Sequence, residues 1–453
     1  MDECVAQPKE KPMEIEVLIG QVREALGALP DARKGGNNQR YSMEDAALSA
    51  FGVFFTQSPS FLDYAQRMQK ERGSNNASTL FGVHEIPSMQ QVRNVLDGVE
   101  AKHLDGLFMD IAESMHKQGQ LQTHRMFNGG IAIALDGTQY FCSTAIGCAH
   151  CSKKKLADGQ ECNFHVVVTP VVVAAGQQDV FALAPSYVMP QDGNEKQDCE
   201  LAASGRWLQK WGHRLKDWKP TYLGDDLYCH EPFCRRVLAE EGDFLFVCLP
   251  NSHATLYEWV ADFERTGTLN SVVHTRWTGK ERVYDTYRFM DHMPLRNADD
   301  TLYVNWCELT TTNAQGKVLY RNAWATSHTI TAHNVVELVE TARSRWKIEN
   351  ENSNTLKTKG YHFEHNFGHG KQHLSSILAS LILLAFLLHT VLDRMDQRYR
   401  TLRQQLPSRR TFFEHLRALL QYVLFESWQE LFDLMLEALK PAAPKRKAPP
   451  ATG

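Results

Sequence analysis

Three acidic residues stand where their carboxylates could meet and hold metal ions. Asp136 and Asp225 each follow a short apolar run, and Glu349 lies far downstream in a segment of helical pattern. Three carboxylates that converge on one point repel each other unless cations lie between them. Mg²⁺ (or Mn²⁺) prefers oxygen ligands and keeps several waters, so the group predicts a site for two such ions. Paired divalent ions suit the cleavage and joining of phosphodiester bonds.

Each acidic residue also has an ordinary structural interpretation. Asp136 begins an Asp-Gly-Thr sequence, which is common in turns. Asp225 belongs to an Asp-Asp pair at a strand end, and such pairs often cap the following helix. A glutamate on a helix, such as Glu349 or its reserve candidate Glu351, is usually solvated. The order of the three residues and their local context favour the metal site.

The Asp-Asp pair offers two candidates for one ligand position. Successive residues of a strand point to opposite faces, so both side chains cannot easily serve one site. Asp225 follows directly on the strand expected over 221–224, which makes it the predicted ligand. Asp226 would then face away and cap or neighbour the helix expected to begin near Glu231.

Three motifs, read in order, resemble those of a known family. The family's motif around its first catalytic aspartate is similar to Leu135-Asp136-Gly137-Thr138. The motif around its second aspartate is similar to Gly224-Asp225-Asp226-Leu227-Tyr228. The family's Arg-Trp-x-Ile-Glu…Lys signature resembles Arg345-Trp346-Lys347-Ile348-Glu349 followed by Leu356-Lys357. The family is that of the DDE transposases of bacterial insertion sequences, in the branch with a β-strand insertion between the second aspartate and the glutamate. The resemblance runs from about residue 131 to residue 389.

The resemblance implies an α/β fold with a ribonuclease H-like catalytic core, interrupted by a β-rich insertion. It implies a DNA transposase in which two Mg²⁺ (or Mn²⁺) ions are held by Asp136, Asp225 and Glu349. Further catalytic roles fall to Arg345 and Lys357, although Lys357 follows Glu349 by eight residues where the family usually has seven. On a regular helix, Arg345 lies one turn from Glu349 on the same face. Lys357 lies roughly 80° round from Glu349, within reach of the same groove. The implied partners are double-stranded DNA, at terminal inverted repeats and at a target, and a second copy of the chain in a homodimer on DNA.

Two other functions share part of this evidence. One is a ribonuclease H-like DNA nuclease without strand transfer, and the other is a non-catalytic DNA-binding protein derived from a transposase. All three acidic positions are present, which favours an active enzyme over the binding protein. The sequence does not separate the transposase from the nuclease.

A second kind of metal site is suggested by cysteine spacing. Cys148 and Cys151 have the two-residue separation of a zinc half-site. Two more ligands would complete a tetrahedral structural site in a hairpin between strands, and the nearby candidates are Cys142, Cys162 and His165. The alternative is that these cysteines bind no metal. Cys229 and Cys234 have a looser spacing, and for them ordinary buried thiols are the favoured interpretation.

Histidines are dense downstream of Glu349. His365, His369 and His373 have the spacing of metal ligands on a helix, but glycines between them disfavour a regular helix. A polar loop near the catalytic face that contacts the DNA backbone is therefore the favoured interpretation. A metal site is the alternative.

The pattern of apolar residues divides the chain into six segments. Helical spacing, with candidate caps Ser42 and Ser88, predicts a helical region over 1–125, and the resemblance implies DNA binding or dimerisation for it. Short apolar runs predict strands over 130–135, 139–143, 164–173, 180–184, 221–224 and 244–249, with helices over 193–216 and 231–241. The segments are 1–125, the first part of the catalytic core (126–250), the β-rich insertion (251–335), the completed core (336–393), a basic helical region (394–439) and a disordered tail (440–453).

Composition limits the classes of protein and partner. The chain has 453 residues and a net charge of −4, so any nucleic-acid surface must be local. Residues 394–453 carry eleven Lys or Arg against six Asp or Glu, a net of +5, which indicates either a phosphate-binding strip or a solvated helix face. The apolar run 374–392 fits a buried core helix better than a membrane span. The first thirty residues lack an apolar signal region, so the expected location is the cytoplasm, with no membrane partner. The resemblance implies that the cell is bacterial.

Overall fold

The structure is a computed structural model that describes residues 13–33, 40–69, 75–190 and 199–440. The expected disordered tail from residue 441 on, the basic run at 445–447 and the start of the helix expected from residue 193 lie outside these ranges. The chain divides into two compact units. Unit 1 comprises residues 1–29, 33–92 and 391–453, and unit 2 comprises residues 30–32 and 93–390.

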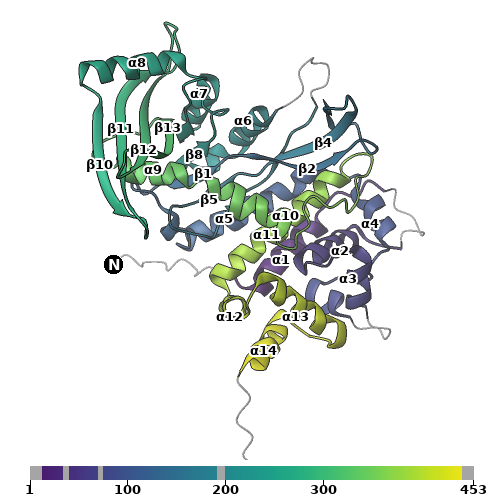
Figure 1. Cartoon of the computed structure of the whole chain (residues 1–453). Helices are drawn as coiled ribbons and strands as arrows, with labels where there is room; N and C mark the ends of the chain where they lie inside the picture. Colours follow the sequence, from purple (N-terminus) through teal and green to yellow (C-terminus); the bar gives the residue numbers. More distant parts are fainter. Residues whose placement is uncertain (1–12, 34–39, 70–74, 191–198, 441–453) are drawn as a thin grey trace, which may run out of the picture. The chain divides into compact units, whose positions relative to one another are not determined.

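Unit 2 is built on a nine-stranded mixed sheet (Figure 1), as expected for an α/β protein. Its strands are β1 (Ile131–Ala134), β5 (Val171–Val173), β6 (Phe181–Ala182), β8 (Pro220–Gly224), β9 (Asp243–Val247), β10 (Asn270–Trp277), β11 (Arg282–Pro294), β12 (Tyr303–Asn313) and β13 (Val318–Thr326). Their order is β10-β11-β12-β13-β9-β8-β1-β5-β6. The pairs β1/β8 and β8/β9 are parallel, and the other neighbouring pairs are antiparallel.

The central strands β1 and β8 are buried along their whole length. Their register places Ala134 opposite Leu223. Continuous apolar runs are typical of parallel strands that are covered on both faces. The residues directly after β1 and β8 therefore emerge side by side at one edge of the sheet.

A smaller sheet contains β2 (Gly137–Ser143), β3 (Ser152–Lys155) and β4 (Glu161–Val168) in the order β2-β4-β3, and β7 (Ser186–Tyr187) pairs with β4. The strand expected over 164–173 is therefore wrong as a single element, because β4 ends at Val168 and β5 begins at Val171 in the other sheet. Pro170 lies between them and has no N–H group to donate to a ladder.

The segment expected to be a β-rich insertion begins with a helix, α8 (Ala254–Thr266). Leu256 and Val260, one helical turn apart, are its buried residues. The strands β10–β13 then follow as expected. Because β13 pairs with β9, they extend the central sheet and do not form a separate layer.

Helices of unit 2 carry or support the residues that concern function. They are α5 (Asp105–Lys117), α6 (Glu200–Trp211), α7 (Glu231–Ala239), α9 (Val335–Arg343) and α10 (Asn354–Thr358). α4 (Met89–Leu96) and α11 (Leu374–Met395) cross the division between the units. α11 is long and apolar enough to span a membrane, but 89% of its most apolar window is buried, as in a core helix.

Unit 1 is helical. Its elements are α1 (Ile15–Gly27), α2 (Met43–Phe55), α3 (Phe61–Met68), α12 (Gln397–Gln405), α13 (Arg409–Tyr422) and α14 (Trp428–Leu439). The expected cap of α2 is confirmed, because Ser42 Oγ accepts a hydrogen bond from Asp45 N at 2.9 Å. Trp428 packs edge-on against Phe55 and Phe81, with ring centroids 5.3 Å apart in both cases.

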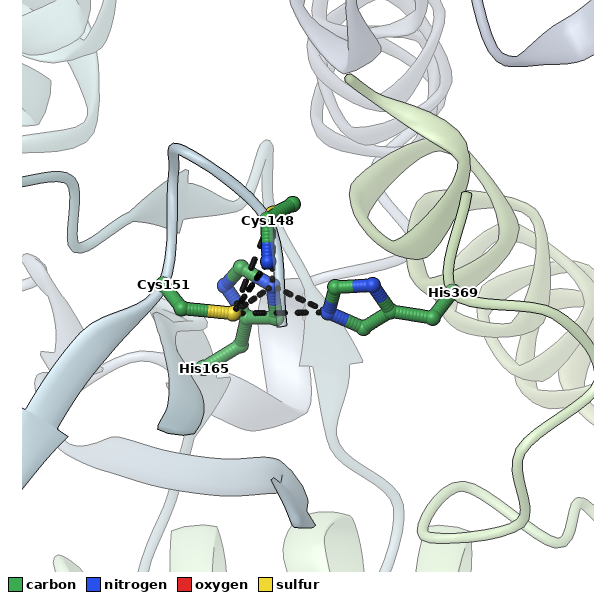
Figure 2. A group of neighbouring side chains, drawn as sticks. All are labelled: Cys148, Cys151, His165 and His369. Atoms are coloured by element: carbon green, nitrogen blue, oxygen red, sulfur yellow. Dashed lines mark hydrogen bonds between the residues drawn. The ribbon is translucent and has the colours of Figure 1, made fainter. Parts of the chain in front are cut away.

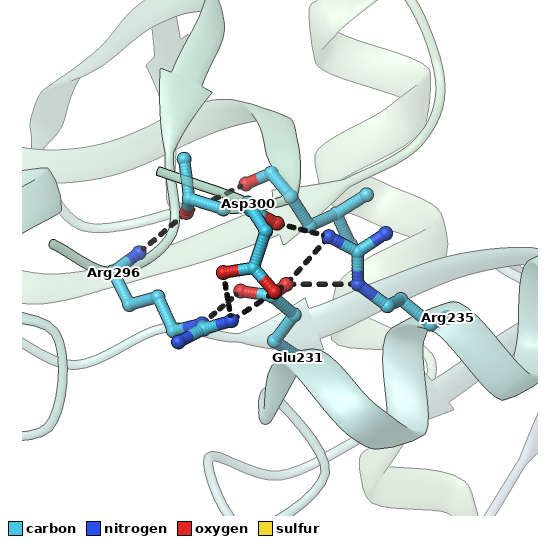
Figure 3. A network of polar contacts seen from close by, with 6 residues as sticks. Glu231, Arg235, Arg296 and Asp300 are labelled. Carbon is cyan, nitrogen blue, oxygen red and sulfur yellow. Dashed lines mark hydrogen bonds and ion pairs between the residues drawn. The ribbon is translucent and has the colours of Figure 1, made fainter. Parts of the chain in front are cut away.

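A polar network fixes the start of α7 against the turn between β11 and β12 (Figure 3). Glu231 accepts hydrogen bonds from Arg235 Nε at 2.8 Å and from Arg296 Nε at 2.5 Å. Arg296 also pairs with Asp300 at 2.7 Å. The Glu231 side chain is buried, so these contacts replace the water that its charge loses.

Candidate active site

Asp136 and Asp225 are brought together by adjacent parallel strands. Leu135 N donates to Leu223 O at 2.8 Å, which continues the ladder one residue beyond β1. Asp136 directly follows Leu135, and Asp225 directly follows Gly224, the last residue of β8. The carboxyl ends of parallel strands are where an open sheet gathers its functional groups.

Glu349 lies in a π-helical segment, Ile348–Ser353, after α9. Arg345 Nη2 donates to Glu349 Oε1 at 2.8 Å, so the expected one-turn pairing is present. Lys347 is buried, and its Nζ donates to the carbonyl of Gln177 in the loop after β5. Short π-helical turns occur often at functional sites, and this one is anchored to the sheet through Lys347.

The charges of these acidic residues act on one another. The pKa of Asp136 is raised to about 7, first by burial and then by the charge of Glu200, with smaller contributions from Glu349 and Asp225, whereas Arg345 lowers it. The interaction with Glu349 favours this residue over its reserve, Glu351. Asp136, Asp225 and Glu349 therefore share one electrostatic site, with Arg345 beside it.

Glu200, the first residue of α6, is a fourth carboxylate that the sequence did not reveal. Its Oε1 accepts a hydrogen bond from Tyr228 Oη at 2.7 Å, and burial raises its pKa. A Cβ atom at Gly137 would lie 2.6 Å from Glu200 Oε2, so glycine permits the close approach. Glu200 is an acidic residue in the first turn of a helix, which is an ordinary stabilising position, and no sequence signal marked it as different. We call Asp136, Glu200, Asp225 and Glu349 the carboxylate group.

Asp226 has a different role from the one expected. Its Oδ1 accepts a hydrogen bond from Leu249 N at 2.7 Å, and its Oδ2 accepts one from Ser252 Oγ. The cap position of α7 is occupied by His230 instead. Asp226 therefore anchors the loop after β9 and does not cap α7. With Asp226 held there, Asp225 is the member of the pair whose charge reaches Asp136.

Lys357 forms an ion pair with Glu364 at 2.9 Å. The geometry expected for it assumed a regular α-helix from Glu349 onward, whereas the chain passes through a π-helical segment before α10. A wider turn changes the direction in which residues eight positions apart point. The catalytic role of Lys357 stays a prediction.

A second group of side chains gathers four possible zinc ligands (Figure 2), which we call the Cys/His cluster: Cys148, Cys151, His165 and His369. Cys148 and Cys151 lie between β2 and β3, His165 lies on β4, and His369 lies in the loop before α11. Burial would raise the pKa of the Cys148 thiol, but hydrogen bonds with His165 and His369 lower it to about 5. The cluster could bind a metal such as zinc.

The cysteine pair and the histidine-rich run, which are far apart in the sequence, thus contribute to the same cluster. His165 was among the candidates for completing the site, and His369 belongs to the histidine-rich run. Cys142 and Cys162 are not members of the cluster. The run itself is not a regular helix between residues 361 and 373, as its glycines indicated. Of His365, His369 and His373, the alternative metal trio, only His369 belongs to the cluster. The favoured interpretation, a loop that contacts the DNA backbone, stays a prediction.

A three-residue group, Cys229, Cys248 and His253, is also close enough to hold a metal, and all three side chains are buried. His253 Nε2 lies 3.4 Å from Asp226 Oδ1. Cys229 was expected to be an ordinary buried thiol. The spacing of residues in the sequence did not indicate that its side chain lies close to that of His253.

The basic helices of the C-terminal region are partly neutralised. Arg398 pairs with Asp433 at 2.7 Å, and Arg410 pairs with Glu414 at 2.7 Å. Arg417 donates to the backbone carbonyls of Thr56 and Gln57, which ties α13 to the residues after α2. These contacts favour a structural role for the three arginines. A phosphate-binding use of the region stays a prediction.

Comparison with models of known protein families and with curated proteins finds no match to this chain. A functional assignment therefore rests on the residues and their geometry. Among the described residues of unit 2, the two largest groups that offer chemistry are the carboxylate group at the carboxyl ends of β1 and β8 and the Cys/His cluster beside the smaller sheet.

Proposed function

We propose that this protein is a DNA transposase of the DDE type, which cleaves and joins DNA strands at the carboxylate group. The observation that carries the proposal is the placement of Asp136 and Asp225 after the adjacent parallel strands β1 and β8, with the charge of Glu349 acting on Asp136. These residues come from two strand ends and a distant helical segment, in the order of the family's three motifs. The mixed sheet with parallel neighbours β1, β8 and β9 is compatible with a ribonuclease H-like core.

The carboxylate group fits hard divalent cations. Its members offer only oxygen atoms, which Mg²⁺ and Mn²⁺ prefer. The pKa of about 7 at Asp136 reflects burial and the neighbouring negative charges, and a bound cation would offset that repulsion. Asp136, Asp225 and Glu349 would hold the ions. When bound, two such ions activate the attacking oxygen and stabilise the leaving one.

Protein side chains prepare this site without the ions. Arg345 donates to Glu349 and thereby fixes the direction of that carboxylate. Tyr228, the last residue of the second-aspartate motif, donates a hydrogen bond to Glu200 and thereby positions the start of α6. Lys347 attaches the π-helical segment to the loop after β5. The three contacts hold the carboxylate group in place before DNA arrives.

Binding to terminal inverted repeats is assigned to the helices of residues 1–125 with help from the basic helices 394–439, and strand transfer is assigned to a homodimer. Unit 1 supports part of this division, because it combines the helices up to residue 92 with α12, α13 and α14. Phosphate contacts would make the affinity fall steeply with salt.

The test uses the purified full chain, Mn²⁺ or Mg²⁺, and duplex DNA that contains the sequences flanking its own gene. Mapping of strand ends is expected to show breaks at the element boundary and, with target DNA present, joined products. Broken ends that are never joined would replace the transposase by a nuclease. Retarded DNA with no cleavage under either metal would leave only a binding function.

A further inference from the structure

We propose that the Cys/His cluster binds one structural Zn²⁺ ion through Cys148, Cys151, His165 and His369. The sequence supplied a half-site, and the fold supplies the two histidines from β4 and from the loop before α11 (Figure 2). Cys₂His₂ is a common ligand set of structural zinc. The proposal concerns a second metal of different chemistry from the carboxylate group.

The four ligand atoms already lie near the corners of a tetrahedron. Zn–S bonds of about 2.3 Å and Zn–N bonds of about 2.05 Å require S–S, S–N and N–N separations of about 3.8, 3.6 and 3.3 Å in a tetrahedral site. The two sulfur atoms lie 3.8 Å apart. His165 Nε2 lies 3.7 and 3.3 Å from the two sulfurs, and His369 Nε2 lies 3.4 Å from Cys151 Sγ. The two Nε2 atoms are 3.1 Å apart. Each of these five separations is within about 0.3 Å of the requirement, and the sixth, between Cys148 Sγ and His369 Nε2, is at most 4.8 Å.

The tautomer of His369 suits a metal ligand. Its Nδ1 lies 3.1 Å from Gly370 O and must donate there, because a carbonyl can only accept. Nε2 then carries a lone pair that faces the cluster. Zinc-bound histidines usually donate their other ring N–H in this way, which fixes the ring and raises its basicity.

The loop that carries His369 is itself held in place. The carboxylate of Asp97 accepts hydrogen bonds from the backbone N–H groups of Lys371, Gln372 and Leu374 at 2.9–3.1 Å. These bonds fix the loop directly after His369. A ligand on a fixed loop loses little conformational entropy when it binds the ion.

The surroundings are those of a closed site. Cys151, His165 and His369 are buried, and the Phe141 ring lies 4.3 Å from the His369 ring. Four protein ligands leave no open position for a water or a substrate, which is typical of a structural zinc and not of a catalytic one. Cys148 and Cys151 would hold the ion as thiolates, whose two negative charges balance that of Zn²⁺.

The ion would link two segments that also carry the carboxylate group. β2 begins directly after Asp136 and leads into the two cysteines, and His369 follows Glu349 after α10. A metal bond between them closes a loop of more than two hundred residues. Its effect on the alignment of Asp136 and Glu349 rests on the proposed function, whereas zinc binding itself does not.

The experiment measures zinc in the full chain purified without chelator. About one zinc per chain is expected, and an organomercurial that blocks thiols should release it. X-ray absorption should give two sulfur ligands at about 2.3 Å and two nitrogen ligands at about 2.0–2.1 Å. Cys148→Ser and His369→Ala should each lose most of the zinc. Well-folded wild-type protein without zinc would overturn the proposal, even if every variant failed to fold.

Three control variants test the ligand set. Cys142→Ser removes an exposed cysteine of the same small sheet, and His150→Ala removes the histidine between the two cysteines. Cys248→Ser disrupts the three-residue group near Asp226. All three should retain the wild-type zinc content. Loss of zinc from Cys248→Ser with retention in Cys148→Ser would move the metal to the other group and contradict the assignment. DNA cleavage plays no part in these readouts, so failure here and failure of the proposed function are distinguishable.

Discussion

The carboxylate group and the Cys/His cluster both collect side chains from distant parts of unit 2, but they are built in opposite ways. In the carboxylate group, like charges face one another, and Asp136 has a pKa of about 7. In the Cys/His cluster, sulfur and nitrogen atoms lie at tetrahedral spacing, and His369 already has an outer hydrogen bond. In the absence of cations, repulsion between the carboxylates raises the free energy of the first arrangement. The second has all its ligand positions provided by the protein.

This difference predicts opposite consequences for stability and activity. Removing a member of the carboxylate group relieves repulsion in the metal-free protein but removes a ligand that the chemistry needs. Removing a member of the Cys/His cluster removes a cross-link but no reacting group. Five experiments, given in decreasing order of predicted effect, test whether the two sites differ in this way.

The largest effect is expected on cleavage. Asp225→Asn and Glu349→Gln should each lower the rate of DNA cleavage at least about 10³-fold, because a lost metal ligand removes several kcal/mol of transition-state stabilisation. Binding to the DNA ends should persist, since phosphate contacts come from basic side chains elsewhere. Strand-cleavage and gel-shift assays on the same preparations check both points. Substantial cleavage by either variant would remove that residue from the site.

Loss of zinc should destabilise the protein. Cys151→Ser is expected to lower the free energy of unfolding by roughly 3–5 kcal/mol, the size expected when a cross-link that closes a long loop is removed. Denaturant unfolding without added Mg²⁺ measures this. Cys142→Ser is the matched control and should unfold like the wild type. An unchanged midpoint in Cys151→Ser would mean that the cluster is not a cross-link.

Asp136→Asn should have the opposite sign in metal-free protein. The folded-state pKa of about 7 lies above the ordinary value of 3.8, so the wild type loses stability as pH rises from about 4 to 7, while the unfolded chain ionises first. Asparagine removes this cost, and the variant should be more stable at pH 8 by about 1–4 kcal/mol. Below pH 4 the two proteins should match. A variant that is less stable than the wild type at pH 8 would show that the carboxylates do not repel one another.

Asp226→Asn tests the division of roles within the Asp-Asp pair. Because Asp226 accepts two hydrogen bonds from the loop after β9, its loss should cost about 1.5–3 kcal/mol of stability, the usual value for bonds to a charged group. Cleavage by the folded variant should remain. The reverse pattern, in which Asp226→Asn is stable but inactive, would exchange the two residues.

The sequence predicted the central strands and the placement of Asp136 and Asp225 because continuous apolar runs mark buried parallel strands. It also predicted the Arg345–Glu349 pair from helical spacing, and the structure confirms the contact. Contacts between distant segments were out of its reach. His369 meets Cys151 across 218 residues, and only the fold brings them together. The helix α8 was missed because the strands around it dominate the pattern of its segment.

The smallest effect is expected from Glu200→Gln, and it decides whether the fourth carboxylate is a ligand or a neighbour. The amide of glutamine can still accept the hydrogen bond from Tyr228, so the start of α6 should stay in place. What disappears is one negative charge beside Asp136, and the pKa of Asp136 should fall. Deprotonated Asp136 is needed to hold a cation, so the acidic limb of the cleavage profile should move to lower pH by up to about one unit, equivalent to about 1.4 kcal/mol. The rate on the alkaline plateau should change little. Glu200→Asp keeps the charge and should leave the limb where it is in the wild type. If Glu200 instead holds a metal ion, Glu200→Gln will lose cleavage at every pH, as Asp225→Asn does, and added Mn²⁺ will not restore the plateau.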